Sequence, residues 1–248
     1  MNIFGLSLIL CLILSILTTP KSTAQEAVTN LPPLTTFERV RFYSLTKVDL
    51  GDARSRNDRG VYGQGRLVLP DQGVEWIVVP GNPDLTTGLV RIGDQTYANT
   101  DGEWRVEDAN AYRSEAFLTG FNLVQQLEQL AACAGTITRL GEMDIAEVTT
   151  THYQFQVPQL TVFEVRGQPI PEVDSVGRVS AENTVYKYDV WIDDEGRVHQ
   201  QNIVEIQKAT TATLPNGEQV SIDEREYHTL VTYYDFDDPD ITVEAPMN

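Results

Sequence analysis

Cysteine is scarce in this sequence, which has only Cys11 and Cys133 among its 248 residues. Cys11 lies in an apolar N-terminal stretch that we expect to be removed, and its loss would leave Cys133 alone. A single cysteine cannot form a disulfide within the chain. The remaining residues are numerous enough to bury a hydrophobic core of ordinary size, so we expect the fold to rest on that core.

Positive charge is also scarce. Eighteen lysines and arginines stand against 36 aspartates and glutamates, which gives a net charge of −18 at pH 7. A negative field of this size repels nucleic acid and anionic lipid headgroups. The composition therefore excludes nucleic acid as a partner and argues against tight docking on an anionic membrane surface.

The usual motifs of enzyme active sites are absent. The three histidines, His152, His199 and His228, lie far apart without metal-ligand spacing, and we interpret them as residues on the polar faces of strands. There is no G-x-S-x-G elbow and no phosphate-binding G-x-x-x-x-G-K loop. The acidic clusters at 193–195 and 235–240 lack the spacing of a calcium loop and indicate solvated turns. We predict no catalytic residues, no metal and no cofactor.

One apolar run opens the chain, at residues 4–17, and it is too short to span a bilayer comfortably. The small residues 22–24 follow it, so we predict a secretory signal, 1–24, cleaved after Ala24. The alternative is an uncleaved anchor, the one route by which we expect membrane association. Ile9 and Leu10 precede Cys11 and the run continues past it, which argues against a lipid-modified cysteine. The protein is expected outside the cytoplasm, whether periplasmic, bound to the envelope or secreted.

We predict a linker at 25–36 and a single domain at 37–248, in which short alternating apolar runs predict many strands. Gly93 and Gly102 stand where tight hairpin turns need residues that tolerate positive φ, so consecutive strands should be antiparallel. A polar excursion is expected at 167–183. The predicted strands are residues 39–50, 60–69, 73–79, 89–92, 96–99, 104–106, 151–157, 161–165, 185–192, 197–206, 227–236 and 241–243.

One segment has helical periodicity. Between residues 114 and 132, apolar side chains recur every three or four positions, which predicts an amphipathic helix capped by Ser114 and closed at Gly135. Cys133, at its end between two alanines, is interpreted as a small core residue. A single helix covering one face of a large sheet leaves either a dense core or an apolar cavity, and the alternation pattern is the same for both.

Four segments in this order resemble LppX/LprG-type lipoproteins. They are 91–97 followed by 101–104, then 141–153, 189–197 and 234–246, and the likeness runs from about Leu67 to Pro246. It implies an α+β, mostly β fold of the LolA-like superfamily, in which a large curved antiparallel sheet (a half-barrel) wraps around one or two helices. It also implies that lipid or acyl chains bind between sheet and helix. The chain departs from the family in lacking its lipid-modified cysteine and a clear N-terminal helix.

The leading hypothesis is a non-catalytic extracytoplasmic carrier or binding protein for a hydrophobic ligand, such as a lipid or acyl chain. The alternative is an envelope structural or interaction module with a filled core and no ligand; a secreted hydrolase ranks third and would need a pocket with a histidine beside a carboxylate. Oligomeric state does not follow from the sequence. The predicted cavity wall comprises Phe117, Phe121, Val124 and Leu127 of the helix, facing Trp76, Tyr97, Tyr153, Phe155, Tyr188 and Trp191.

Overall fold

The computed structural model describes residues 25–49, 60–78, 87–99, 102–107 and 120–246. The predicted signal segment 1–24 and the first part of the predicted helix, 114–119, lie outside the described residues. Both remain predictions.

Twelve strands form one open antiparallel sheet in the order β1-β8-β9-β10-β11-β14-β2-β3-β4-β5-β6-β7. A two-stranded sheet, β12 (Thr210–Thr213) and β13 (Gln219–Ile222), extends from it. The strands of the large sheet are β1 (Glu26–Val28), β2 (Arg39–Asp49), β3 (Val61–Val68), β4 (Gln72–Val78), β5 (Thr87–Ile92), β6 (Gln95–Asn99), β7 (Trp104–Glu107), β8 (Ile137–Ile145), β9 (Val148–Pro158), β10 (Thr184–Ile192), β11 (Val198–Gln207) and β14 (Arg225–Tyr234).

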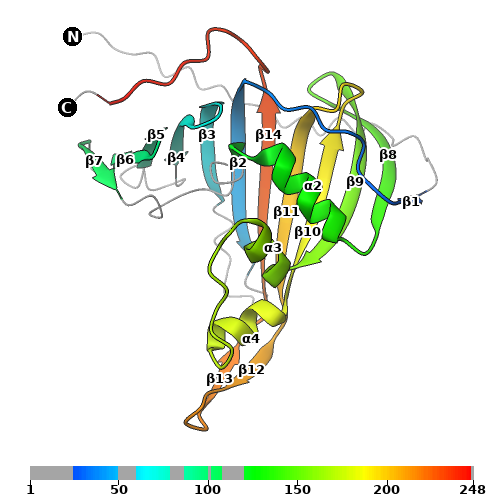
Figure 1. Cartoon of the computed structure of the whole chain (residues 1–248), viewed down its shortest axis with the longest axis vertical. Coiled ribbons are helices and arrows are strands. Elements are labelled where there is room, and N and C mark those ends of the chain that lie inside the picture. The colour runs from blue at the N-terminus through cyan, green and yellow to red at the C-terminus, as the bar shows by residue number, and fades with distance from the viewer. Residues whose placement is uncertain (1–24, 50–59, 79–86, 100–101, 108–119, 247–248) are drawn as a thin grey trace.

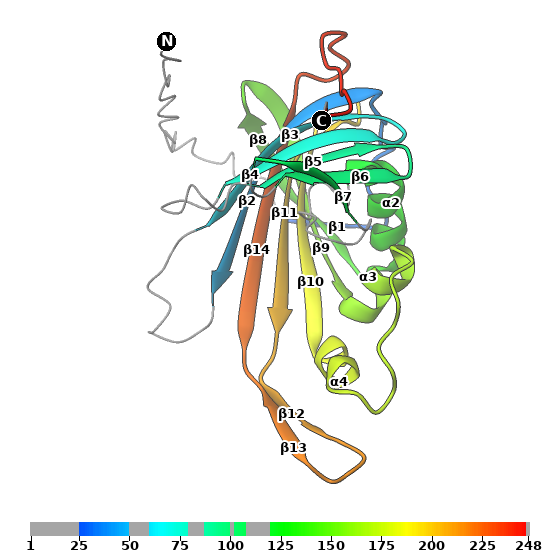
Figure 2. The ribbon, with the colours of Figure 1, turned by 90° about the vertical axis from the view of Figure 1, so that its left-hand side faces the viewer.

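The helices of the described residues are α2 (Leu123–Cys133), α3 (Gln159–Val165) and α4 (Val176–Glu182). Helices α2 and α3 lie on one side of the sheet, and α4 lies at its lower end beside β12 (Figure 1). Strands β3 to β7 bend over the upper end of the sheet toward α2, so this side is concave (Figure 2). The mostly β fold, with a large curved antiparallel sheet around helices, is confirmed.

Most predicted strands are present, but three local predictions were wrong. Residues 161–165 belong to helix α3, because β9 ends at Pro158 and a short apolar run does not distinguish a strand from a buried helical turn. Residues 241–243 form no strand, although Ile241 is fully buried. Cys133 is exposed, because the buried stripe of α2 ends at Ala131.

The N-terminal segment that was predicted as a linker contacts the sheet at two places. Strand β1 pairs with β8. Farther along, the amide of Thr35 donates to the carbonyl of Gly196 at 2.9 Å, and its hydroxyl donates to the carbonyl of Glu195 at 2.6 Å. Gly196 lies in the turn between β10 and β11 with a φ of +84°, a conformation that favours glycine.

The contact between this turn and the N-terminal segment gives a stability prediction. An ideal Cβ at position 196 would lie 2.5 Å from the carbonyl oxygen of Pro33, closer than real Cβ contacts. We expect Gly196→Ala to lower the free energy of unfolding by about 2–3 kcal/mol, through backbone strain and through displacement of the segment at Pro33. Urea unfolding measures the loss.

Gly217 provides the matched control. It has nearly the same φ, +82°, in the turn between β12 and β13, and nothing lies within 4 Å of the position that a Cβ would take there. Gly217→Ala should therefore cost only the backbone strain, about 1 kcal/mol. Equal losses in the two variants would show that the approach of the N-terminal segment contributes nothing.

Candidate ligand-binding site

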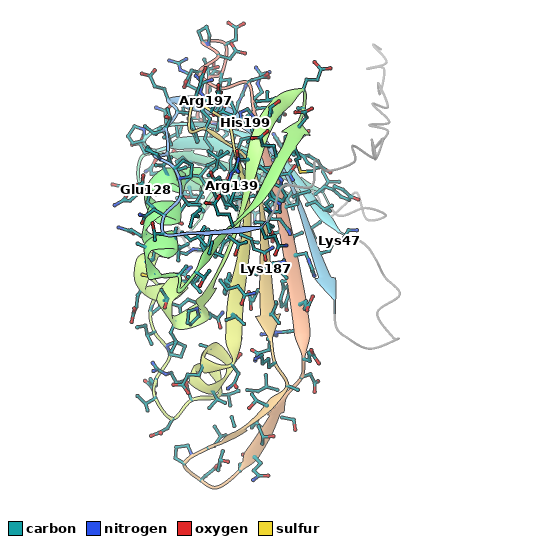
Figure 3. All side chains as sticks on the ribbon, turned by 90° about the vertical axis from the view of Figure 1, so that its right-hand side faces the viewer. Lys47, Glu128, Arg139, Lys187, Arg197 and His199 are labelled. Carbon is teal, nitrogen blue, oxygen red and sulfur yellow. The ribbon has the colours of Figure 1, made fainter. Side chains whose placement is uncertain are left out.

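Helix α2 presents one apolar stripe to the concave face of the sheet. Leu123, Leu127, Leu130 and Ala131 are its buried residues, at the spacing that places side chains on one helical face. Glu128 is exposed, and Figure 3 shows it on the side of α2 that faces away from the sheet. The helix is therefore held to the sheet mainly by three leucines, each worth about 1.5–3 kcal/mol when fully buried.

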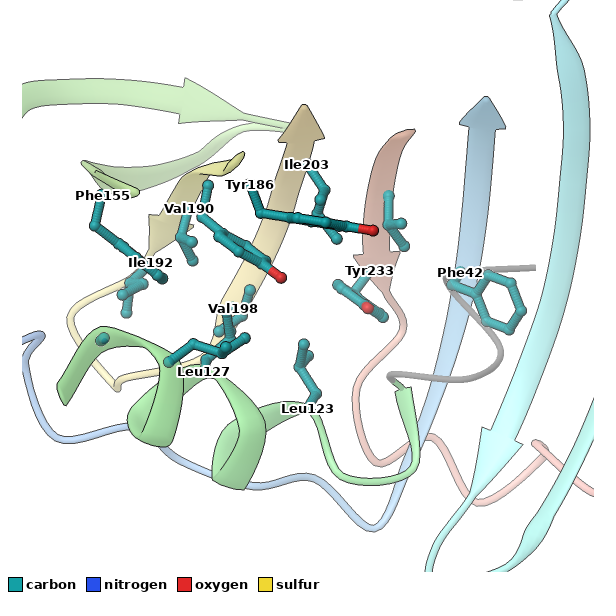
Figure 4. Packing of buried hydrophobic residues seen from close by; sticks show 14 of the residues in the cluster. Phe42, Leu123, Leu127, Phe155, Tyr186, Val190, Ile192, Val198, Ile203 and Tyr233 are labelled. Atoms are coloured by element: carbon teal, nitrogen blue, oxygen red, sulfur yellow. The ribbon is translucent and has the colours of Figure 1, made fainter. Parts of the chain in front are cut away.

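Paired residues of neighbouring strands form rows on the concave face, because residues opposite one another in an antiparallel sheet point to the same side. One row runs from Phe155 on β9 through Tyr188 and Ile203 to Thr229 and Thr46. The rings of Phe155 and Tyr188 stack with centroids 5.1 Å apart and planes 10° apart. Figure 4 shows Phe155 and Ile203 of this row on the side of the sheet where Leu123 and Leu127 of α2 lie.

The space directly between α2 and the sheet is filled. Leu123, Leu127, Phe155, Val190 and Tyr233 belong to one cluster whose members are all buried. Val162 of α3 extends the cluster. In this structure the helix and the sheet thus form a packed core among the described residues, and two pockets adjoin it.

The structure brings several of the predicted site residues together. Leu127, Phe155 and Tyr188 are core residues between helix and sheet, and Tyr153 packs against their cluster. Phe121 is buried just before α2, with the guanidinium carbon of Arg91 4.8 Å from its ring centroid. The partly buried Val124 lines a pocket at the beginning of α2, whereas Phe117 lies outside the described residues.

Three predicted residues lie on the opposite, convex face. Trp191 lies between Val190 and Ile192, which point toward the helices, and it stacks on His152 with centroids 4.3 Å apart. Trp76 is 40% exposed and packs on Trp104, 5.7 Å away. The pairing of the strands places Tyr97 on this face too. These residues have the opposite phase of alternation from the core residues, so they do not lie between sheet and helix.

The pocket at the beginning of α2 has a volume of about 240 Å³, and we call it the helix pocket. Its wall combines five large apolar side chains with polar residues and one glycine. Its lining residues are Phe37, Leu69, Phe121, Leu123, Val124, Thr36, Gly120, Asn122, Gln125 and Glu128.

A second pocket, of about 250 Å³, lies on the concave face of β2, β14, β11 and β10. We call it the sheet pocket. Ile203, Tyr186 and Tyr227 form its apolar walls, and the other lining residues are polar: Thr46, Glu205, Arg225 and Thr229. Each pocket is smaller than the roughly 300–1,000 Å³ of typical small-molecule sites, so neither alone would enclose a whole lipid.

The histidines pair with carboxylates but line neither pocket. His152 Nε2 lies 2.9 Å from Asp189, and His199 Nε2 lies 2.8 Å from Asp193. His228 contacts the neighbouring Glu226. In the part of the chain that the structure describes, no three histidine, cysteine or acidic side chains gather as metal ligands would. The hydrolase hypothesis needs a pocket lined by a histidine beside a carboxylate. Neither of these two pockets is lined by a histidine.

Asp189 is a buried carboxylate on the convex face. Burial by itself would raise the pKa of Asp189, but hydrogen bonds from His152 and Gln154 and the charge of Lys187 together hold it below its usual value of 3.8. The Nε2 of Gln154 donates to Asp189 at 2.6 Å. These contacts join β9 to β10 and stabilise the carboxylate form.

The lowered pKa sets the direction of a pH dependence. Because the folded state binds the Asp189 proton more weakly than the unfolded state, the contribution is complete above about pH 4 and is lost as the pH falls through the folded pKa. We expect Asp189→Asn to lower the free energy of unfolding by about 1–2 kcal/mol near pH 7 and by less near pH 3. Urea unfolding across this range tests it, with exposed Asp144→Asn as the control; a difference independent of pH would contradict it.

The sheet pocket was missed in the sequence. Its polar residues occupy core-facing positions of strands, where the alternation pattern predicts apolar side chains. Thr229, Tyr227 and Arg225 alternate along β14, and Glu205 follows Ile203 on β11. The sequence did contain a sign of this pocket: in two predicted strands, polar residues occupy positions that alternate in step with the buried apolar ones.

Comparisons with known proteins bear on the fold. No family model and no curated protein sequence matches the chain. Among solved structures, LprF from Mycobacterium bovis is 12% identical, with a TM-score of 0.50, and the match covers 86% of this chain and 90% of that one. The Mycobacterium tuberculosis lipoprotein LppX is 13% identical, with a TM-score of 0.48 and coverages of 84% and 90%. A putative outer membrane lipoprotein-sorting protein domain from Vibrio parahaemolyticus is 9% identical, with a TM-score of 0.25 and coverages of 82% and 86%.

Sequence identities this low support a conclusion about the fold alone. The match to LprF extends over most of both chains, and it agrees with the order of motifs in the sequence and with the open curved sheet. The chain therefore shares the fold of LprF, as its resemblance to LppX/LprG-type lipoproteins implied.

Proposed function

We propose that this protein is a non-catalytic extracytoplasmic carrier that binds a lipid or another ligand with a long acyl chain between the curved sheet and the helices α2 and α3. The ligand would contact Leu127, Phe155 and Tyr188, together with Phe121 and Val124 at the helix pocket. Export would follow from the signal predicted at 1–24. In the described residues no helix is long and apolar enough to cross a membrane.

The observation that supports this proposal is the position of the two pockets. Both adjoin the buried cluster under α2: Phe121 and Leu123 of that cluster line the helix pocket, and Tyr186 and Ile203 line the sheet pocket. A chain joining them would run through the layer that α2 now covers. Loading therefore requires α2 to move away from the sheet.

The cost of that movement is limited. Moving the three buried leucines of α2 fully into water would cost at most about 9 kcal/mol, and less if they repack on the ligand. An acyl chain gains about 0.8 kcal/mol for each buried methylene, so a chain of about twelve methylenes offsets even this upper value. The proposal thus favours long chains over short ones.

Native mass spectrometry of the exported protein is the direct experiment. We expect an additional mass of a few hundred daltons that disappears on denaturation and is identified as lipid in the organic extract. Saturated fatty acids of increasing length should also compete for a fluorescent fatty acid, with affinity rising steeply above about ten carbons. A single delipidated mass together with no binding of the fluorescent fatty acid would overturn the proposal.

The rival hypothesis is an interaction module with a filled core. The burial of Leu123 and Leu127 in one cluster with residues of the sheet favours it in this structure. The two hypotheses differ in whether α2 moves. The exposed Cys133, at the end of α2, accepts an environment-sensitive fluorophore; a change of its emission on adding palmitate supports the carrier, and no change at saturating palmitate supports the module.

A further inference from the structure

The sheet pocket contains a cation whose buried nitrogen has no hydrogen-bond partner. Nε of Arg225 is buried and makes no hydrogen bond. The guanidinium carbon lies 5.4 Å from the ring centroid of Tyr227, so the ring covers one side of it. No ion pair joins Arg225 to another described residue. A buried N–H without a partner costs roughly 1–3 kcal/mol, so the site favours an acceptor supplied from outside the chain.

Gln207, the cross-strand neighbour of Arg225, already uses its side-chain amide in other hydrogen bonds. Arg225 pairs across the strands with the fully buried Gln207. The side-chain oxygen of Gln207 accepts from the hydroxyls of Ser180 and Thr184, and its amide nitrogen donates to the carbonyl of Lys208. The pairing of β11 with β14 therefore gives Arg225 no acceptor at this position.

The rest of the pocket presents both donors and acceptors. Glu205 accepts a hydrogen bond from the hydroxyl of Tyr186 at 2.8 Å. The hydroxyls of Thr46 and Thr229 lie 3.2 Å apart, and each can donate or accept. Ile203 and the ring of Tyr186 form the apolar wall beside them, and Figure 4 shows these two side chains next to each other. The pocket is thus apolar on one side and offers hydrogen bonds of both kinds on the other.

The charges in and around the sheet pocket indicate what kind of polar group it can bind. Within the lining, the positive charge of Arg225 is balanced by Glu205. The guanidinium carbon of Arg166 lies 6.0 Å from the centroid of the Tyr186 ring. Asp223 and Glu224 precede Arg225 in the sequence, whereas Glu226 has the opposite phase of alternation and points to the convex face. The chain as a whole carries −18. An anionic group would gain Arg225 and meet this negative field, whereas an uncharged group with several hydroxyls would use Arg225 and Glu205 together.

We infer that the sheet pocket binds the uncharged, hydroxylated head group of an amphiphile, a glycerol or a sugar, with Arg225 donating to its oxygens and Glu205 accepting from its hydroxyls. This rests on the proposed function in one respect, that the attached acyl chain lies under α2. The volume of about 250 Å³ suits a head group and excludes the whole lipid.

The test uses amphiphiles that share a twelve-carbon chain and differ in the head: monolaurin, dodecyl β-D-glucoside and laurate, titrated below their micelle concentrations by calorimetry. Wild-type protein should bind monolaurin or the glucoside at least tenfold more tightly than laurate, and the tighter of the two identifies glycerol or sugar. Arg225→Gln should weaken that ligand about tenfold. The isosteric Glu205→Gln should strengthen laurate severalfold, because it removes the negative charge while keeping an acceptor for Tyr186.

Arg105→Gln is the control, since Arg105 is an exposed residue of β7 that pairs with Glu103, and both residues lie outside the two pockets. It should leave every affinity unchanged. Laurate bound as tightly as the neutral amphiphiles, and weakened by Arg225→Gln, would overturn the inference in favour of an anion site. Equal binding of all three that neither pocket variant changes would overturn it while leaving the carrier proposal intact. No binding of any amphiphile would overturn both.

Discussion

Tyr188→Ala is expected to lower the free energy of unfolding by about 3–5 kcal/mol, the loss seen when a large buried aromatic is truncated. Tyr188 is 1% exposed at the centre of the sheet, stacked on Phe155 and next to Tyr186, whose ring centroid is 6.4 Å away. Its hydroxyl accepts a hydrogen bond from Arg166 at 3.3 Å, which links the end of α3 to β10. Removing the ring opens a cavity under the helices and also removes this link.

Tyr188→Phe separates the two contributions. It keeps the ring and its stacking and removes only the hydroxyl, so the expected loss is about 0.5–1.5 kcal/mol. Chemical unfolding followed by circular dichroism measures both variants. A loss below about 1 kcal/mol for Tyr188→Ala would mean that the layer between sheet and helices is loosely packed, which contradicts a filled core.

The same row of residues shows what the sequence could predict about the fold. Strong alternation, as in Tyr186, Tyr188 and Val190, predicted strands at the correct positions, because a half-buried strand imposes a period of two. Short runs were less certain. Residues 161–165 alternate much as a strand does, yet the turn after Pro158 directs them into α3. Strand β1 has only three residues and lies in the predicted linker, just before the Pro- and Thr-rich residues 30–36. Its pairing with β8 depends on residues more than a hundred positions away.

The candidate site was harder to predict for a physical reason. The alternation pattern identifies two faces of each strand but not which of them meets the helix, so Trp76, Tyr97 and Trp191 were assigned to the cavity wall although they lie on the convex face. Aromatic side chains suit both faces, since they pack across strands as well as in a core. Alternation places Arg225 on the same face as Tyr227, but the predicted strand began at residue 227, and the position of Arg225 beside Gln207 depends on the register between β11 and β14.

Val124→Trp is expected to weaken binding of a long-chain amphiphile at least tenfold without destabilising the protein. Val124 is partly buried and lines the helix pocket, where an indole would occupy space that we propose for the end of the acyl chain. Excluding two or three methylenes at about 0.8 kcal/mol each removes roughly 2 kcal/mol of binding free energy, which is more than a tenfold change in affinity. Because the indole fills a void rather than an occupied core, the unfolding midpoint should not fall.

Val173→Trp is the matched control, because Val173 is 76% exposed and lines neither pocket. It adds the same apolar surface and should leave the affinity unchanged. Fatty acids of different length make the comparison more specific. If the indole shortens the site, the penalty in Val124→Trp should be largest for the longest fatty acids and should nearly vanish for a chain two or three carbons shorter. A penalty that is the same for every length would place the acyl chain elsewhere, and identical binding by both variants would exclude the helix pocket from the ligand path.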